Sequence, residues 1–339
     1  MHFVVLGTGG IGGYYGARLQ AHGQRVTFIA RGINLETLQT RGLRVTHPEF
    51  RFDGAVEACS LEQFFQTSLP READLIIVCV KATDTEATAV RLAEGLGGSP
   101  IPVLSLQNGV DNETVLAGHL GVERVLGGLA VRIGSHLTAP AVVDAVGLAQ
   151  VVMGQWPNAG AGSLWTDLLN RLDSVFNQAG IPTRVTDNIQ LELWRKLIVN
   201  NGVNPLSALT GLDTGAIMLD SGLSQIVHGL MAEATAAAAA DGIDLTEADC
   251  AEMYELIRHF DPIKTSMLVD LEHNRPLELE EICGAVLSRS AQLKREAPYT
   301  FTIYHLLRRL VASRGQCIVN KVSTYRHPRA GGGPECVDS

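Results

Sequence analysis

The chain has 339 residues, enough for about two domains of ordinary size, and its 46% hydrophobic content can fill a sizeable core. The 27 Lys and Arg against 36 Asp and Glu leave a net charge of −9, which argues against nucleic acid and anionic membrane surfaces as partners. Six cysteines form no CxxC pair, and neither a signal-peptide pattern nor an apolar run of 18 residues is present. We therefore expect a cytoplasmic protein without a metal site and without a membrane span.

The first half alternates short β-branched runs with helical patterns, which is typical of a parallel α/β sheet. Helices are expected near residues 10–21 and 163–179, and residues 135–157 are expected to form a hairpin or an extended pair. The candidate strands are residues 3–6, 25–29, 43–45, 75–80, 103–106, 125–128, about 149–153, and 182–185.

From about Asp187 the pattern becomes helical throughout. Asp261 and Pro262 predict a helix N-cap and first helical position, and a further helix is expected to begin near Leu277. We therefore predict an α/β fold, with an N-terminal Rossmann-type dinucleotide-binding domain over residues 1–186 and an all-helical domain over 187–314. Residues 315–339 lack apolar periodicity and are expected to be a poorly ordered tail.

The strongest local motif is GTGGIG, which comprises Gly7, Thr8, Gly9, Gly10, Ile11 and Gly12. It matches G-x-G-x-x-G, and it stands between a predicted strand and a predicted helix, the context in which this motif binds dinucleotides. Gly7 permits the tight turn, Gly9 lets the backbone approach a pyrophosphate, and Gly12 lets the helix pack on the strand. A glycine-rich turn without a ligand is the alternative interpretation.

The choice of dinucleotide depends on the end of the second strand, where NAD sites place an acidic residue that binds the ribose 2′-hydroxyl. No acidic residue occurs between His22 and Asn34, and Arg31 occupies this place. A guanidinium offers charge and paired donors to a 2′-phosphate, so NADP is favoured over NAD. The alternative is an ordinary solvated surface arginine.

In the second half, Lys196, Asn200 and Asn204 are spaced four residues apart, which places them along one face of a helix. A solvated helix face would show the same spacing. Further along, the chain supplies Ser266, Asp270 and Glu278. If these groups converge, they could bind and protonate a small oxo acid.

These segments carry a resemblance to a known family. In this order and at these distances, GTGGIGGYYGARL, CVKA, LQNGV, LWRKLIVNNGVNPLSAL and TSMLVDLEHNRPLELEEICG resemble the ketopantoate reductases over roughly residues 1–312. The resemblance implies reduction of 2-dehydropantoate to (R)-pantoate with NADPH, on the route to pantothenate and coenzyme A. It also implies a Rossmann domain, a helical domain, and an active site in the cleft between them.

The resemblance assigns roles to individual residues. It makes Lys196 the proton donor and places Glu278 beside the nicotinamide ribose and the reacting end. The remaining assignments are Lys81, Asn108 and a backbone contact at Ile133 for the cofactor. The substrate set comprises Asn108, Lys196, Asn200, Asn204, Thr214 and Ser266.

Two positions depart from the family pattern. Thr214 stands where relatives often carry an Asn that helps to hold substrate, and Cys283 replaces an Asn common in the final motif. They leave open a reductase of another branched 2-oxo acid. A non-catalytic NADP-binding sensor is a weaker alternative, because it would not need Lys196. A small 2-oxo acid is the expected partner, and a homodimer remains an open alternative for the assembly.

Overall fold

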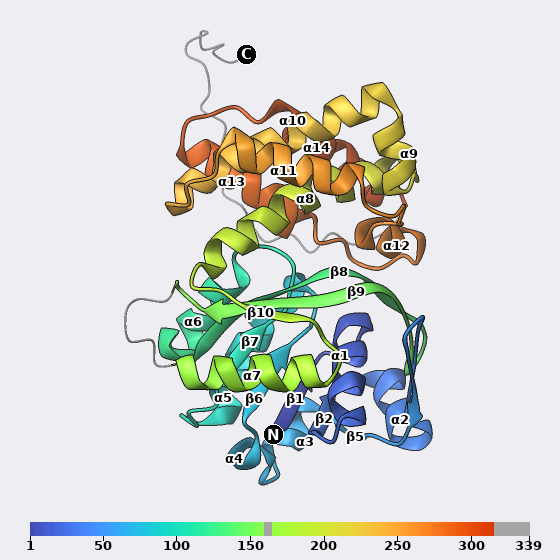
Figure 1. Cartoon of the computed structure of the whole chain (residues 1–339), viewed down its shortest axis with the longest axis vertical. Coiled ribbons are helices and arrows are strands. Elements are labelled where there is room, and N and C mark those ends of the chain that lie inside the picture. The colour runs from blue at the N-terminus through green and yellow to red at the C-terminus, as the bar shows by residue number, and fades with distance from the viewer. Residues whose placement is uncertain (159–164, 315–339) are drawn as a thin grey trace, which may run out of the picture.

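Strand β1 (His2–Leu6) is a central strand of the sheet. Apolar side chains project from both of its faces, so both faces of the sheet must be covered. Phe3 and Val5 belong to one apolar cluster, whereas Val4 and Leu6 belong to the cluster on the opposite face. The computed structural model describes residues 1–158 and 165–314 (Figure 1). The expected tail lies outside the described residues.

The sheet has ten strands in the order β4-β3-β9-β8-β7-β6-β1-β2-β5, with β10 paired to β9. Strands β5, β2, β1, β6, β7 and β8 run parallel to one another, which confirms the expected Rossmann-like arrangement. The other strands are β2 (Arg25–Ile29), β3 (Leu43–His47), β4 (Phe50–Gly54), β5 (Glu57–Cys59), β6 (Leu75–Val78), β7 (Val103–Ser105), β8 (Val125–Ala139), β9 (Val142–Gln155) and β10 (Thr183–Val185).

Helices cover both faces of this sheet. Helix α1 (Gly10–Ala21) contacts β1, β2, β3, β8 and β9, while α5 (Thr85–Leu96) and α6 (Asn112–Leu120) pack together on the opposite face. The remaining helices of this half are α2 (Gly32–Arg41), α3 (Leu61–Phe65), α4 (Leu69–Glu72), α7 (Thr166–Gln178) and the short 3-10 turns η1 (Ala82–Asp84) and η2 (Val122–Arg124).

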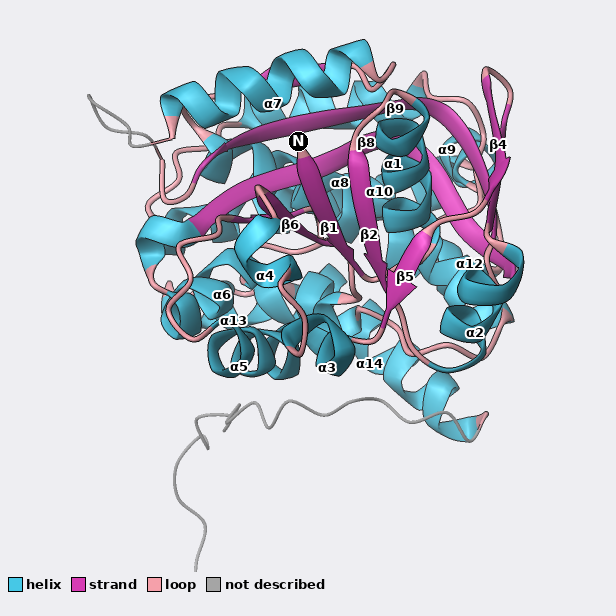
Figure 2. Ribbon diagram, turned by 90° about the horizontal axis from the view of Figure 1, so that it is seen from below, coloured by secondary structure: helices cyan, strands magenta, loops and turns pink. Residues whose placement is uncertain are grey.

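The β8–β9 hairpin curls the sheet around α1. It is far longer than the separate strand and hairpin expected from the sequence, and its ladder shifts register between Val131 and Ile133. The first residues of β9, Val142 to Asp144, pair with β3. The hairpin therefore connects the central strands to the β3–β4 edge of the sheet (Figure 2). Strand β5 was missed because it has only three residues and pairs with β2, far back in the chain. Strand β4 forms a hairpin with the adjacent β3, and it was missed because its sequence, FRFDG, alternates half-buried and exposed residues and includes Asp and Gly.

The second half is entirely helical, as expected, and its centre is α8 (Ile189–Thr210). Apolar residues of α8 pack against both this half and the sheet, where Leu129 and Val152 join the same cluster (Figure 1). The other helices are α9 (Thr214–Leu219), α10 (Ser221–Ala237), α11 (Glu247–Arg258), α12 (Ser266–Glu272), α13 (Ala285–Gln292), α14 (Pro298–Ser313), the 3-10 turn η3 (Ala238–Asp241) and the π-turn η4 (Glu280–Gly284). No helix within residues 1–158 and 165–314 is long and apolar enough to cross a membrane.

The helix start predicted at Asp261 and Pro262 is wrong. Ile263 instead forms two hydrogen bonds with Thr214: its carbonyl oxygen accepts from the Thr214 N–H at 3.0 Å, and its N–H donates to Thr214 Oγ1 at 3.1 Å. This pairing holds the segment out of a helix. Helix α12 begins only at Ser266, after Thr265 has capped it by accepting from the Leu268 N–H.

Gly12 gives a test of the packing between α1 and the sheet. A methyl group there would collide with the Gly7 carbonyl oxygen and lie 2.8 Å from Val5 Cγ1, so Gly12→Ala should lower the free energy of unfolding by about 1 to 3 kcal/mol. Urea denaturation followed by circular dichroism measures this change. Gly9→Ala is the matched control, because a methyl group at Gly9 meets nothing within 4 Å. Equal stability of the two variants would contradict the packing explanation.

Candidate functional site

A cleft of about 960 Å³ lies between the carboxyl ends of the central strands and the helical half. With one exception, every site residue expected from the sequence lines it. The lining residues are Gly7, Thr8, Gly9, Gly10, Ile11, Arg31, Lys81, Asn108, Ile133, Lys196, Asn200, Asn204, Thr214, Ser266 and Glu278. The exception is Gly12, which instead faces Gly7 and the adjoining strand.

The glycine-rich turn carries the features of an anion site. Gly7 has a φ of +100°, a conformation that favours glycine, and its N–H donates to the Ile29 carbonyl oxygen. Gly9 is the N-cap of α1 and provides no side-chain hydrogen bond to the first turn, which also lacks acidic residues. The first-turn N–H groups therefore have no side-chain acceptor, and the space beside Gly9 is open for a phosphate.

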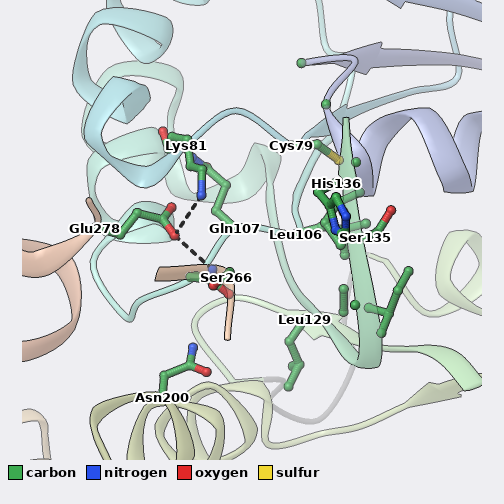
Figure 3. Close-up of a pocket in the computed structure, with 18 of the residues that line it drawn as sticks. Cys79, Lys81, Leu106, Gln107, Leu129, Ser135, His136, Asn200, Ser266 and Glu278 are labelled. Carbon is green, nitrogen blue, oxygen red and sulfur yellow. Dashed lines mark hydrogen bonds and ion pairs between the residues drawn. The ribbon is translucent and has the colours of Figure 1, made fainter. Parts of the chain in front are cut away.

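The bulged part of β8 lines the cleft next to the glycine turn. Arg132 has a φ of 54° there, and the bulge places Ile133 at the cleft. The backbone of Ser135 lies directly against Gly10, so β8 crosses the start of α1 (Figure 3). Ile133 can thus reach a molecule bound at the glycine turn through its backbone.

Arg31 lies just beyond the end of β2, at the same end of the cleft as the glycine turn, because the Gly7 N–H donates to Ile29 at the end of this strand. Its side chain is 82% exposed, and its Nη2 donates to Asp84 Oδ2 at 2.6 Å. Asp84 belongs to η1, which follows β6, so the sequence around Arg31 gives no sign of this partner. The guanidinium is available to an anionic ligand, but it already has a carboxylate beside it.

Glu278 is contacted by three groups of the sheet half. Its Oε1 accepts from the Ala82 N–H at 2.9 Å, and its Oε2 accepts from Asn108 Nδ2 at 2.9 Å. Lys81 Nζ lies 3.7 Å from the same Oε2 (Figure 3). Only 5% of Glu278 is exposed, so this carboxylate is a buried charge held by donors from the sheet half.

Asp270 is a second buried carboxylate that the sequence-based assignment left without a role. Lys81 Nζ lies 2.5 Å from Asp270 Oδ2, and Arg275 Nε lies 3.1 Å from Asp270 Oδ1. Burial opposes the charged form of Lys81, but Glu278 and Asp270 outweigh it and raise the pKa of Lys81. Its spacing of four residues from Ser266, one turn along α12, is the signal that could have identified Asp270.

The predicted stripe on α8 lies on the opposite wall. Lys196, Asn200 and Asn204 all line the cleft, as helical spacing requires. Burial lowers the pKa of Lys196 to about 8, against the opposing effect of Glu278 and Glu113. Asn200 points into the cleft, and its Nδ2 is buried without a hydrogen-bond partner (Figure 3). A buried N–H donor without an acceptor is energetically costly, and a ligand oxygen bound here could supply the acceptor.

Thr214 and Ser266 complete the wall near these amides. Thr214 is buried at the start of α9, and its hydroxyl oxygen already accepts from the Ile263 N–H. Ser266 is exposed at the first position of α12. Cys283, the other departure from the family pattern, does not line the cleft; it is fully buried in η4 within the helical core.

The cleft therefore combines two kinds of site. One end has the turn, the open helix start and the exposed guanidinium that suit a dinucleotide. The other end holds Lys196 with its lowered pKa, the unpaired amide nitrogen of Asn200, and the buried carboxylate of Glu278. A lysine whose pKa is close to neutral pH can donate a proton to a developing oxyanion, and the amides can orient a polar substrate.

Comparison with known proteins agrees with this geometry. Residues 3–158 match the model of the family "Ketopantoate reductase PanE/ApbA", and residues 188–311 match the model of its C-terminal part. The 2-dehydropantoate 2-reductase of Archaeoglobus fulgidus is 30% identical over 90% of this chain and 96% of its own length. That of Pyrococcus horikoshii is also 30% identical, over 91% of this chain and 97% of its own.

Solved structures show the same likeness. The crystal structure of a PanE/ApbA family ketopantoate reductase from Ralstonia eutropha JMP134 is 28% identical, with a TM-score of 0.81 over 93% of this chain and 100% of its own. A ternary structure of D-mandelate dehydrogenase with NADH and anilino(oxo)acetate has a TM-score of 0.83 over 93% of this chain and 100% of its own. At 21% identity, it is evidence for the fold alone.

Both halves of the chain thus match one family in sequence, and 93% of the chain matches a solved member in fold. The chain belongs to the ketopantoate reductase family of oxidoreductases.

Proposed function

We propose that this protein reduces 2-dehydropantoate (ketopantoate) to (R)-pantoate with NADPH, in the cytoplasm and on the route to pantothenate and coenzyme A. The observation that carries the proposal is the position of Lys196, whose lowered pKa suits proton donation, in one cleft with Asn200 and Glu278. The names of the relatives, 2-dehydropantoate 2-reductase, support the same reaction.

The residues at the glycine turn fit a dinucleotide. The open space at Gly9, the uncapped first turn of α1 and the backbone at Ile133 would hold its diphosphate and adjoining ribose. Arg31 would bind the 2′-phosphate of NADP, exchanging its contact with Asp84 for that with the phosphate. When bound, the nicotinamide supplies the hydride that reduces the ketone carbon.

The chain's own residues would handle orientation and the proton. The Lys196 ammonium would donate a proton to the alkoxide oxygen that forms from the ketone, leaving a neutral amine. Asn108, fixed by its hydrogen bond to Glu278, would contact both cofactor and substrate. Asn200, Asn204 and Ser266 would hold the oxo acid, with the buried Asn200 Nδ2 donating to a substrate oxygen.

A second candidate substrate is another branched 2-oxo acid. The observation that favours it is Thr214, whose hydroxyl oxygen is engaged by Ile263 and which has a single donor where an amide would have two. This alternative keeps the reaction and the proton donor and changes only which oxo acid fits.

Arg31→Ala should weaken NADPH binding by about 2 kcal/mol, or roughly 30-fold in Kd, because a charge-assisted hydrogen bond to the 2′-phosphate is lost. NADH lacks that phosphate, so its binding should change little. Fluorescence titration of the variant with both dinucleotides measures the two effects. Equal losses for NADPH and NADH would contradict the assignment of Arg31.

Lys196→Ala should reduce kcat by roughly 10² or more, the usual range for a general acid, while NADPH still binds. In the unmodified enzyme, kcat should fall as pH rises through about 8, because Lys196 must be protonated to donate. Steady-state rates across pH, with NADPH titration as the check on folding, test both statements. Near-normal turnover in the variant would show that the proton comes from another group.

The substrate is tested by following NADPH oxidation with a panel of 2-oxo acids. Ketopantoate should exceed its deoxy analogue, 2-oxo-3,3-dimethylbutanoate, by at least about 10²-fold in kcat/KM, because polar groups suited to the hydroxyl would otherwise stay unpaired. Asn200→Ala or Asn204→Ala should reduce this ratio, mainly by slowing the hydroxylated substrate. If the unmodified enzyme used both compounds equally, the alternative 2-oxo acid would be the better account.

A further inference from the structure

Glu113 is a fully buried carboxyl group that the proposed mechanism does not yet use. It lies in the first turn of α6 and is 0% exposed. Both carboxyl oxygens are buried without a hydrogen-bond partner. Ser105 and the Glu113 backbone amide are near enough to favour the charged form, but neither reaches hydrogen-bond geometry. Buried carboxyl groups are costly unless paired, so this one calls for a functional explanation.

Glu113 does not line the cleft, but its segment adjoins residues that do. The segment that leads into α6 carries Asn108, which contacts Glu278, and Asn112 Nδ2 donates to the Asn108 carbonyl oxygen at 2.7 Å. Asp111, the N-cap of α6, pairs with Arg289, whose guanidinium lies 5.9 Å from the centroid of the Trp194 ring on α8. The start of α6 therefore lies near the part of α8 that carries Lys196.

Two charged groups act on this carboxyl. Lys196 on α8 favours its ionised form, whereas Asp111, two residues before it and paired with Arg289, opposes its ionisation. Two carboxyl groups act on Lys196 in turn: Glu278 and Glu113, and both favour the protonated amine. Glu278 is already engaged by Ala82, Asn108 and Lys81. Glu113 has no such competing donors.

We propose that Glu113 is a positioning residue that acts through Lys196, holding the lysine in its protonated, donating form from outside the cleft lining. The inference rests on the proposed role of Lys196 as proton donor. It adds a second carboxylate to that role and explains why a charged residue type occupies a fully buried position with no hydrogen bond of its own.

The effect of Glu113 should depend on pH in a way that a structural role would not. Burial raises the pKa of Glu113 to about 7 and lowers that of Lys196 to about 8. Below about pH 6, Glu113 is neutral and Lys196 is protonated in any case, so the carboxyl contributes little. Above pH 7, Glu113 is ionised and opposes the loss of the lysine proton.

The decisive variant is Glu113→Gln, which keeps shape and removes the charge. We expect its kcat to match that of the unmodified enzyme at pH 6. The pH at which its kcat falls on the basic side should be lower by about one unit, the usual effect of one nearby charge. Its kcat at pH 8.5 should therefore be several-fold lower. Glu113→Asp should restore the limb at least in part.

Glu86→Gln is the matched control. Glu86 is exposed and contacts α6 through His119, so this variant removes the same charge near the same helix outside the cleft. Its profile should coincide with that of the unmodified enzyme. A basic limb that is unchanged in Glu113→Gln, or a loss of kcat that is equal at every pH, would overturn the proposal for Glu113.

Two further measurements keep the outcomes separate. If Lys196→Ala retained normal turnover, the proposed function of Lys196 would fail, whatever Glu113 does. If Glu113→Gln does not fold, the coupling can be measured in the unmodified enzyme and in Lys196→Met by infrared titration of buried carboxyl groups. The carboxyl that titrates near pH 7 should do so at higher pH in Lys196→Met, and an unchanged titration would overturn the proposal.

Discussion

The geometry of the cleft depends on the carboxylate of Glu278. This residue belongs to the helical half, yet the groups that neutralise it, the Ala82 N–H, Asn108 Nδ2 and Lys81, all belong to the sheet half. A buried charge that loses its partners costs about 3 to 5 kcal/mol, so separating the two halves is unfavourable. Asp270 makes the same kind of contact with Lys81. Asp270 is also paired with Arg275 of its own half, so it is the charge of Glu278 that is neutralised only where the two halves meet.

Features encoded within a short stretch of sequence could be predicted. The glycine turn and the Lys196, Asn200, Asn204 stripe were recognisable because both depend on spacing within one strand–helix unit or one helix. The length of the β8–β9 hairpin, the pairing of β3 with β9 and the bond between Thr214 and Ile263 could not be read this way. They depend on residues far apart in the chain, and local patterns carry no signal for them.

The same distinction applies to charge. The sequence identifies Arg31 at the end of β2 but not Asp84, which reaches it from another loop at 2.6 Å. An exposed ion pair of this kind contributes little to stability and can be exchanged for a phosphate. Glu113 shows the opposite case, because nothing in its sequence neighbourhood distinguishes a buried carboxyl from a solvated one on a helix start. Its burial is a property of the folded chain alone.

The polar groups around the substrate end of the cleft differ in what they can still offer. The Thr214 hydroxyl oxygen already accepts a hydrogen bond from the Ile263 N–H, so it is less available as an acceptor for a ligand. Asn200 Nδ2 is buried with no acceptor, and leaving such a donor unmet costs about 1 to 3 kcal/mol. A substrate oxygen that reaches Asn200 recovers this energy, whereas an apolar substituent cannot. If the oxo acid binds at this end as proposed, its selectivity should come from the α8 amides, because Thr214 contributes to the cleft lining but already accepts from Ile263.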